Sequence, residues 1–225
     1  MSGKKGKTAM RPLMLLLATL DLLNAFELKR SGSWEAYLGG QYVSGERIDF
    51  DGGAKADLND RAAFLFGFGY NFDNHLNLGA MFGSSSANYR GTSVCPETSK
   101  ECTPGETETF TASMYTSQFN LTGTYNFMEG KFTPFVQGNL GFTYIDSGSR
   151  SGDGYCYWDP WWGYQCYGTN YTETRFNYGA QVGLRYELGY AAFIKAGVGL
   201  NYIDLSHATN PGFTVYNLVI GMKFK

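Results

Sequence analysis

The segment FLFGFGYNF at residues 64–72 decides the fold, because two kinds of side chain alternate along it. Every second position is aromatic: Phe64, Phe66, Phe68, Tyr70 and Phe72. The small or polar residues Gly67, Gly69 and Asn71 stand between the last four of these rings. A period of two residues places the two sets on opposite faces of a β-strand. The segment therefore predicts a strand with one strongly apolar face.

Similar alternation recurs from Trp34 to Phe224 in eight segments of about ten residues, the length of a tilted strand that crosses a bilayer. The stretches GNLGFTY (138–144), AQVGLRY (180–186) and AGVGLNY (196–202) repeat one theme of glycine or polar residues between apolar ones. The repeating unit is therefore expected to be the β-hairpin.

The connections between these segments alternate in length. Long connections are expected near 45–60, 90–107, 146–172 and 204–213, and tight turns near Asp73, Glu129 and Leu188. Membrane barrels have short periplasmic turns and long outer loops. Residues 32–225 are therefore predicted to form an all-β, eight-stranded antiparallel up-and-down transmembrane β-barrel in the outer membrane of a Gram-negative-type bacterium, with both termini in the periplasm.

A soluble barrel such as a lipocalin also alternates and closes, so the less apolar face must decide between the two. A face in bulk water would be rich in charge, whereas this face is mostly glycine, amide and hydroxyl residues. Its isolated charges are Glu35, Arg175, Arg185, Lys195 and Lys223. Small uncharged residues suit a crowded lumen, so the apolar face is expected to contact lipid.

Residues 1–26 are predicted to be a secretory signal peptide whose cleavage site the sequence does not fix. Lysines and Arg11 form a basic start, and the apolar core from Leu13 to Leu20 is too short to span a bilayer as a helix. The formal net charge is −2, so no basic field draws nucleic acid to the protein. The expected partners are outer-membrane lipid or lipopolysaccharide and an extracellular ligand or host surface. The chain is expected to be a monomer without cofactors.

Four cysteines lie in two predicted outer loops: Cys95, Cys102, Cys156 and Cys166. The oxidising periplasm favours disulfides, and the lower entropy cost of short loops favours the two local pairs among the three possible pairings. The gaps match no zinc spacing, so no metal site is expected.

The third of these loops, GYCYWDPWWGYQCYG (154–168), is rich in aromatic residues. Its candidate recognition residues are Tyr157, Trp158, Trp161, Trp162 and Tyr164. Rigid aromatic side chains on a pinned loop are typical of a recognition surface. The alternative is that the rings pack on one another at the barrel mouth or in the membrane interface.

Buried charges need partners, and Glu35 and Lys223 are neighbours if the first and last strands close the barrel. We expect these two to pair, with Arg185 or Lys195 joining them, as a polar plug inside the lumen. A gated conductance is the functional alternative.

The segment H-A-T-N at 207–210 resembles the H-x-S-N motif of the lipid A 3-O-deacylases, in which histidine is the general base and serine the nucleophile. Thr209 stands in place of that serine. No glutamate follows between Gly212 and Lys225 to orient the base, so no catalytic residue is predicted. The other histidine, His75, is expected to be a turn residue.

The stretches TPFVQGNLGFTY (133–144), FNYGAQVGLRYEL (176–188) and YNLVIGMKF (216–224) resemble the small OmpA-like, opacity-type outer membrane β-barrels, also labelled porin family proteins. The resemblance implies an eight-stranded barrel with roles in adhesion or envelope stability. The function predicted is a non-enzymatic barrel that presents disulfide-pinned loops for envelope structure or surface interaction. A narrow channel for small solutes and a lipid A deacylase-like enzyme are the alternatives.

Overall fold

The computed structural model describes residues 29–94, 103, 105–150, 155–159, 163–167, 170–189, 191–205 and 208–225. In chain order the elements are β1 (Ser33–Val43), β2 (Glu46–Asp49), the short 3-10 helix η1 (Asp51–Gly53), β3 (Lys55–Leu58), β4 (Arg61–Asn71), β5 (Leu76–Val94), β6 (Thr107–Asn126), β7 (Phe132–Arg150), β8 (Tyr155–Asp159), β9 (Gly163–Tyr167), β10 (Asn170–Glu187), β11 (Ala192–Ile203) and β12 (Gly212–Phe224). No helix within the described ranges is long and apolar enough to cross a membrane.

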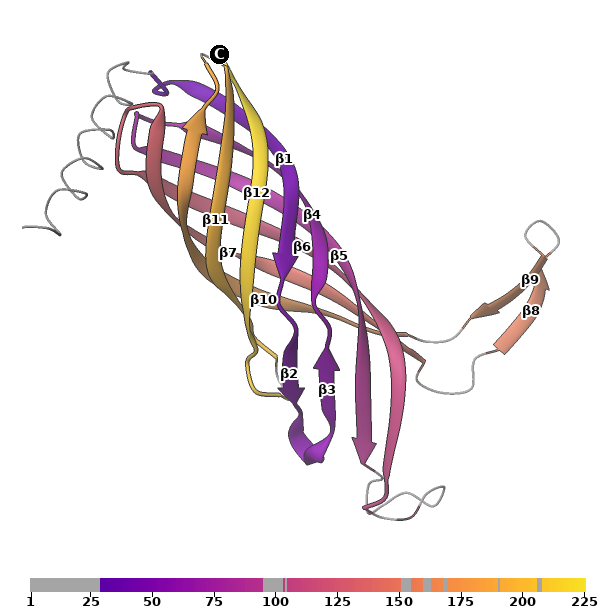
Figure 1. The fold of residues 1–225 in the computed structure, drawn as a ribbon. Helices are drawn as coiled ribbons and strands as arrows, with labels where there is room; N and C mark the ends of the chain where they lie inside the picture. The colour runs from indigo at the N-terminus through magenta and orange to yellow at the C-terminus, as the bar shows by residue number, and fades with distance from the viewer. Residues whose placement is uncertain are drawn as a thin grey trace, which may run out of the picture.

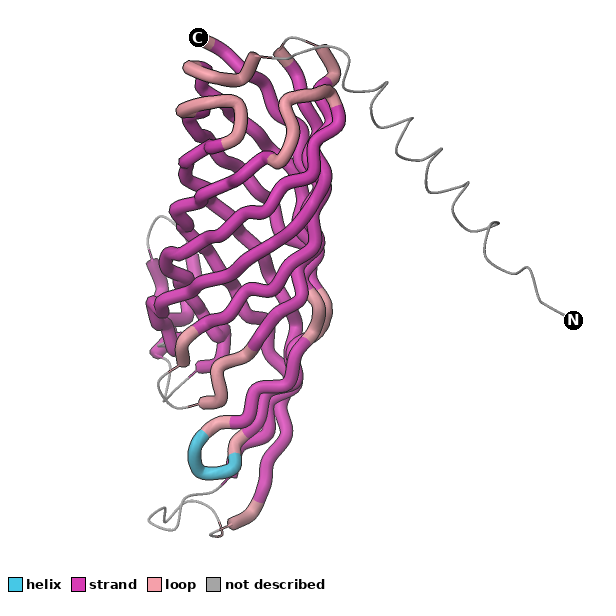
Figure 2. The backbone as a smooth tube through the Cα atoms, turned by 90° about the vertical axis from the view of Figure 1, so that its left-hand side faces the viewer, coloured by secondary structure: helices cyan, strands magenta, loops and turns pink. Residues whose placement is uncertain are grey.

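Eight of the strands close into one antiparallel barrel (Figures 1 and 2). The order around the barrel is β1, β4, β5, β6, β7, β10, β11 and β12, and β12 pairs again with β1. A closed barrel has no free edge, so its backbone N–H and C=O groups are paired even where only lipid surrounds them. The predicted fold class and strand number are confirmed.

The two faces of the strands lie as the alternation predicts. Leu38 is 54% exposed and Leu218 is 61% exposed, whereas Glu35 and Asn120 are each 1% exposed. Large apolar side chains therefore cover the outside and polar side chains fill the inside, the reverse of a soluble protein. Such a surface suits lipid on the outside and a crowded polar lumen within.

The short turns and the C-terminus lie at the same end of the barrel (Figure 1), and aromatic side chains belong to the strand ends there. The rings of Trp34 and Tyr70 have centroids 5.1 Å apart, and those of Tyr70 and Phe72 are also 5.1 Å apart. Phe127 and Phe224 are more than half exposed nearby. Rings of this kind favour the interface between hydrocarbon and water, so they form one girdle of the barrel.

The turn after β4 shows how this end is built. Oδ1 of Asp73 accepts hydrogen bonds of 2.7 Å from the backbone N–H groups of Leu76 and His75, which lower the pKa of this exposed carboxyl. The His75 ring lies 2.7 Å (Nδ1) from the carbonyl oxygen of Asn126 and 3.2 Å (Nε2) from Glu129. His75 is thus a turn residue that ties two neighbouring turns together.

The strands at the other end are longer than the alternation predicted. β5, β6 and β7 have 19, 20 and 19 residues, and β2 and β3 occupy half of the segment 45–60 that was expected to be loop. β3 pairs with β5, so the first hairpin continues the sheet beyond the closed barrel (Figure 1). Ladder hydrogen bonds need no apolar face, and strands therefore persist where the alternation of apolar residues has ended.

Candidate functional site

The buried carboxylate of Glu187 organises the lumen near the short turns. Its Oε1 lies 2.9 Å from Nε of Arg30 and 2.8 Å from Nε of Arg185. Its Oε2 lies 2.9 Å from Nζ of Lys223, although the two are not aligned as a hydrogen bond. Arg30, Arg185 and Glu187 are at most 1% exposed. One buried carboxylate therefore interacts with three cationic side chains inside the barrel.

Glu35 is the second carboxylate of this cluster. Arg185 donates to it through both terminal nitrogens, Nη2 to Oε1 at 2.7 Å and Nη1 to Oε2 at 3.0 Å. Nδ2 of Asn71 also donates to Oε1, at 2.8 Å. A two-pronged guanidinium–carboxylate pair of this kind is among the strongest hydrogen-bonded contacts available to side chains.

The expected pairing of Glu35 with Lys223 takes a different form. The two residues are directly opposite in the β1–β12 register, but Lys223 approaches Glu187 and Glu35 binds Arg185. Lys195 lies deeper in the lumen among aromatic rings, with Nζ 5.4 Å from the ring centre of Tyr37. The guanidinium of Arg185 reaches both carboxylates and offers a planar fork, which an ammonium group lacks.

Arg30, which the sequence analysis did not single out, seals the end of the barrel. Its side chain is fully buried and uses every N–H donor of a guanidinium group. The acceptors are Glu187 Oε1 (2.9 Å), the carbonyl oxygens of Asn74 (2.9 Å), Met128 (2.9 Å) and Gly130 (3.0 Å), and Thr133 Oγ1 (2.7 Å). The only signal for it in the sequence is a cation just before the first strand, which is too common to single out.

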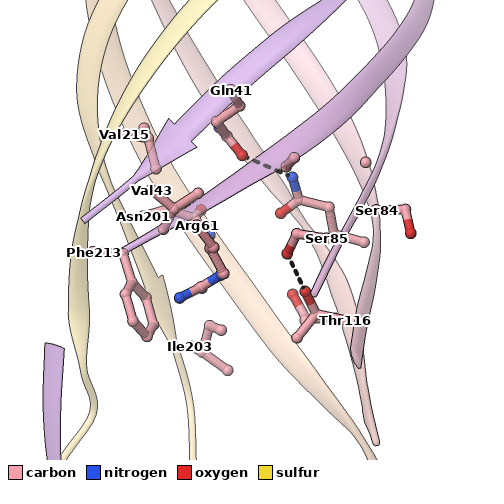
Figure 3. Close-up of a pocket in the computed structure, with 14 residues that line it drawn as sticks. Gln41, Val43, Arg61, Ser84, Ser85, Thr116, Asn201, Ile203, Phe213 and Val215 are labelled. Carbon is pink, nitrogen blue, oxygen red and sulfur yellow. Dashed lines mark hydrogen bonds between the residues drawn. The ribbon is translucent and has the colours of Figure 1, made fainter. Parts of the chain in front are cut away.

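The lumen between the two ends holds little free space in the described part of the chain. One cavity of about 30 Å³ lies beside Arg61 (Figure 3), and one of about 20 Å³ lies beside Lys195. Cavities of this size hold one or two water molecules. Side chains therefore fill the interior, as expected for a barrel of eight strands.

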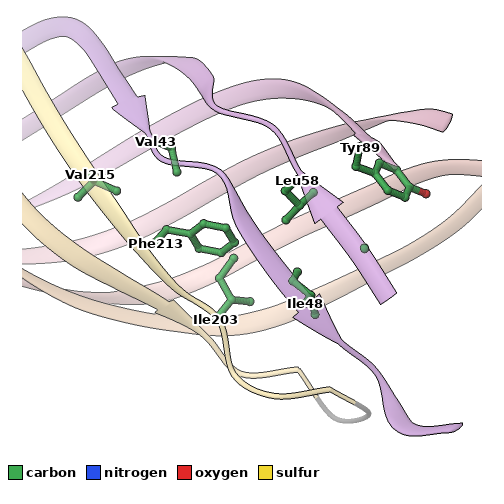
Figure 4. Packing of buried hydrophobic residues seen from close by; sticks show 8 residues of the cluster. Val43, Ile48, Leu58, Tyr89, Ile203, Phe213 and Val215 are labelled. Carbon is green, nitrogen blue, oxygen red and sulfur yellow. The ribbon is translucent and has the colours of Figure 1, made fainter. Parts of the chain in front are cut away.

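The lumen is apolar toward the end opposite the short turns, contrary to the expectation of a polar inner face throughout. Val43, Ile48, Leu58, Tyr89, Ile203, Phe213 and Val215 form one buried cluster there (Figure 4). Above it opens an apolar cavity of about 360 Å³, which we call the outer cup. Its walls include Leu58, Tyr89, Met114 and Ile145, and Arg175 beside Glu173 lies at its edge.

One signal in the sequence points to the buried apolar cluster. Phe213 and Val215 give the first half of β12 apolar residues on its inner face, so the usual contrast with the lipid face is absent there. Other members of the cluster, such as Ile48 and Leu58, come from β2 and β3, strands of four residues each. A period of two is not recognisable over so few positions.

The third of the predicted long connections carries a hairpin formed by β8 and β9. Cys156 and Cys166 are directly opposite in its register, and so are Trp158 and Tyr164. Tyr157 is opposite Gln165. The other loop residues singled out, namely Cys95, Cys102, Trp161 and Trp162, lie outside the described residues, as do the signal segment 1–26 and His207.

The remaining residues of the H-A-T-N segment lie in the fourth of the predicted long connections. Ala208 forms an isolated bridge with Phe50, and the backbone N–H of Thr209 donates to the carbonyl of Asp49 at 3.1 Å. Oδ1 of Asn210 accepts from the backbone N–H of Leu205 at 3.0 Å. These contacts give Thr209 and Asn210 a structural role at the rim of the barrel.

Comparison with known proteins agrees with this architecture. Residues 14–224 match the family model described as "Outer membrane protein beta-barrel domain". The chain is similar in structure to neisserial surface protein A (13% identity, 85% of this chain, 97% of that chain, TM-score 0.53). It is also similar to the outer membrane protein OprG of Pseudomonas aeruginosa (16% identity, 88% of this chain, 99% of that chain, TM-score 0.52).

At such low identities the similarity shows a shared fold, and it does not show that this chain shares the functions of those proteins. No curated protein is similar enough in sequence to count as a relative. The family match, the closed barrel and its lipid-facing surface agree with one another. The chain therefore belongs to the outer membrane protein beta-barrel domain family and is a protein of the outer membrane.

Proposed function

We propose that this barrel acts at the cell surface, without catalysis and without conducting solutes, by presenting its outer loops for envelope structure or surface interaction. The sealed inner end is the observation that carries the proposal. Arg30 and Glu187 close the lumen with buried, paired charges, and the cavities beyond them have volumes of only about 30 and 20 Å³. A filled lumen leaves the outer end as the place where the barrel meets other molecules.

The lengths of the connections support an orientation for the barrel. The described turns at 72–75 and 127–131 are short, and the C-terminus lies at their end of the barrel (Figure 1). The long connections, including the one that contains β8 and β9, join the strands at the opposite end of the barrel. Because periplasmic turns are short in such barrels, we place both termini in the periplasm and the outer cup outside the cell.

Conductance in planar bilayers tests the sealed lumen against the channel alternative. We expect no resolvable current steps from the wild-type barrel, because neither cavity admits more than a water or two. The Glu35→Ala variant should also give no current steps, since Arg185 and the aromatic layer around Lys195 still fill the lumen. An open porin reconstituted in the same way is the positive control. Discrete steps from the wild type, altered in the variant, would support a gated channel instead.

The outer hairpin supports a local disulfide in the third loop. Directly opposite positions on antiparallel strands bring Cα atoms to about 4.5–5.5 Å, within the range that a disulfide spans. Cys156 and Cys166 occupy such positions. We propose that this bond pins the aromatic segment 157–164, and that Cys95 pairs with Cys102 in the second loop.

An adhesion assay tests the role of the pinned loop. Cells that express a variant with residues 157–164 replaced by a Gly-Ser repeat should adhere to host-cell layers several-fold less than wild-type cells. Mild reductant should weaken wild-type adhesion to a similar degree, because the segment is then no longer pinned. The matched control replaces residues 188–191 in an inner turn. Equal adhesion by all three strains would contradict a recognition role for this loop.

A further inference from the structure

Arg61 is a buried cation without a partner in the described part of the chain. It begins β4, is 8% exposed, and its Nε and Nη1 atoms have no hydrogen-bond acceptor. No described carboxylate lies within 4.0 Å of its guanidinium group. The ring of Phe213 contacts that group at 4.7 Å, which offsets only part of the lost hydration.

The other buried charges do not compensate Arg61. The described residues bury five cationic side chains, Arg30, Arg61, Arg185, Lys195 and Lys223, and two anionic ones, Glu35 and Glu187. Both carboxylates belong to the cluster near the short turns, where they bind Arg30, Arg185 and Lys223. The described part of the lumen therefore carries an excess of positive charge, and Arg61 and Lys195 lie outside the charged cluster.

A small cavity lies beside this guanidinium group. Its volume is about 30 Å³, and Figure 3 shows Arg61 reaching into it next to Phe213. Hydroxyl and amide side chains line one side, among them Ser85, Thr116 and Gln118, and apolar ones such as Ile203 line the other. Hydroxyl and amide groups can turn donors toward a guest.

We propose that this cavity is a binding site for a small monovalent anion of the halide type, held by Arg61. The cavity is too small for larger anions such as phosphate monoesters. A bound ion would lose part of its hydration, because one side of the cavity is formed by the apolar residues Val43, Ile203, Phe213 and Val215. In such surroundings a single opposite charge interacts far more strongly than it does in bulk water. Water alone would satisfy the hydrogen bonds of Arg61 but would leave its charge unbalanced.

Halide NMR on the folded barrel in detergent tests the site. The 35Cl signal of the wild-type protein should broaden in a saturable way, and bromide should reverse the broadening by competition. Arg61→Gln should lower the apparent affinity at least tenfold, because the guanidinium charge is gone. The matched control is Arg47→Gln, whose side chain is 55% exposed beside Asp49 and should leave the broadening unchanged.

A heat-modifiability gel shows whether Arg61→Gln has folded. If it has not, wild-type crystals grown in bromide decide the question, and an anomalous peak beside the guanidinium of Arg61 is expected. Bromide found only at the protein surface, or broadening that Arg61→Gln leaves unchanged, would overturn the proposal. A non-binding anion such as gluconate at equal ionic strength separates specific binding from screening.

Discussion

The Glu187→Gln variant is expected to lose about 3–5 kcal/mol of folding stability, the usual cost of removing one partner of a buried ion pair. The substitution preserves shape but leaves Arg30, Arg185 and Lys223 with one carboxylate fewer inside the barrel. Urea unfolding of the barrel in lipid vesicles measures the loss. The temperature at which the folded gel band converts to the unfolded one should fall in parallel.

Two comparisons make this result specific. Glu129→Gln removes a carboxylate that is 41% exposed beside His75, and it should change stability by less than about 1 kcal/mol. Adding Lys223→Met to Glu187→Gln removes one of the cations that lost its carboxylate partner, and this should restore part of the lost folding stability. If Glu187→Gln unfolds at the wild-type urea concentration, the charged cluster does not stabilise the barrel.

The second large effect is expected from Gly67→Val, at about 1–3 kcal/mol and with a lower folding yield. Gly67 is opposite Tyr37 in the β1–β4 register, and the Tyr37 ring lies over it, so that any Cβ at 67 would overlap the ring. Tyr37 is 9% exposed and packs in the layer with Lys195. Valine would displace the ring from that layer, because the cavity of about 20 Å³ beside it is too small to receive the ring.

Gly138→Val is the control for this substitution. Gly138 is also a strand glycine, but nothing lies within 4 Å of a Cβ built there, and its face is the lipid-facing one. Valine at 138 should be tolerated or slightly stabilising, because it favours extended backbone. The measurement is again urea unfolding in vesicles. Equal destabilisation by both variants would show that strand glycines matter for the backbone alone and not for the packing of Tyr37.

The tertiary structure decided which charged side chains pair inside the lumen. The positions of Glu35 and Lys223 opposite each other follow from the closure of the first and last strands, which the alternation predicted. Their binding partners do not, because the twist of the barrel brings Arg185 from β10 across the lumen to Glu35. Arg30 precedes the first strand and belongs to no pattern, so only the folded chain reveals that three turn carbonyls converge on it.

The alternation in FLFGFGYNF and its repeats predicted a β-barrel, and the scarcity of charge on the polar face predicted that the apolar face meets lipid. The tertiary structure decided which side chains seal the end with the short turns, where the apolar cavity lies, and that Arg61 is buried without an acidic partner among the described residues. Each depends on side chains from strands far apart in the chain that meet across the lumen, and the period of a single strand carries no information about what lies opposite it.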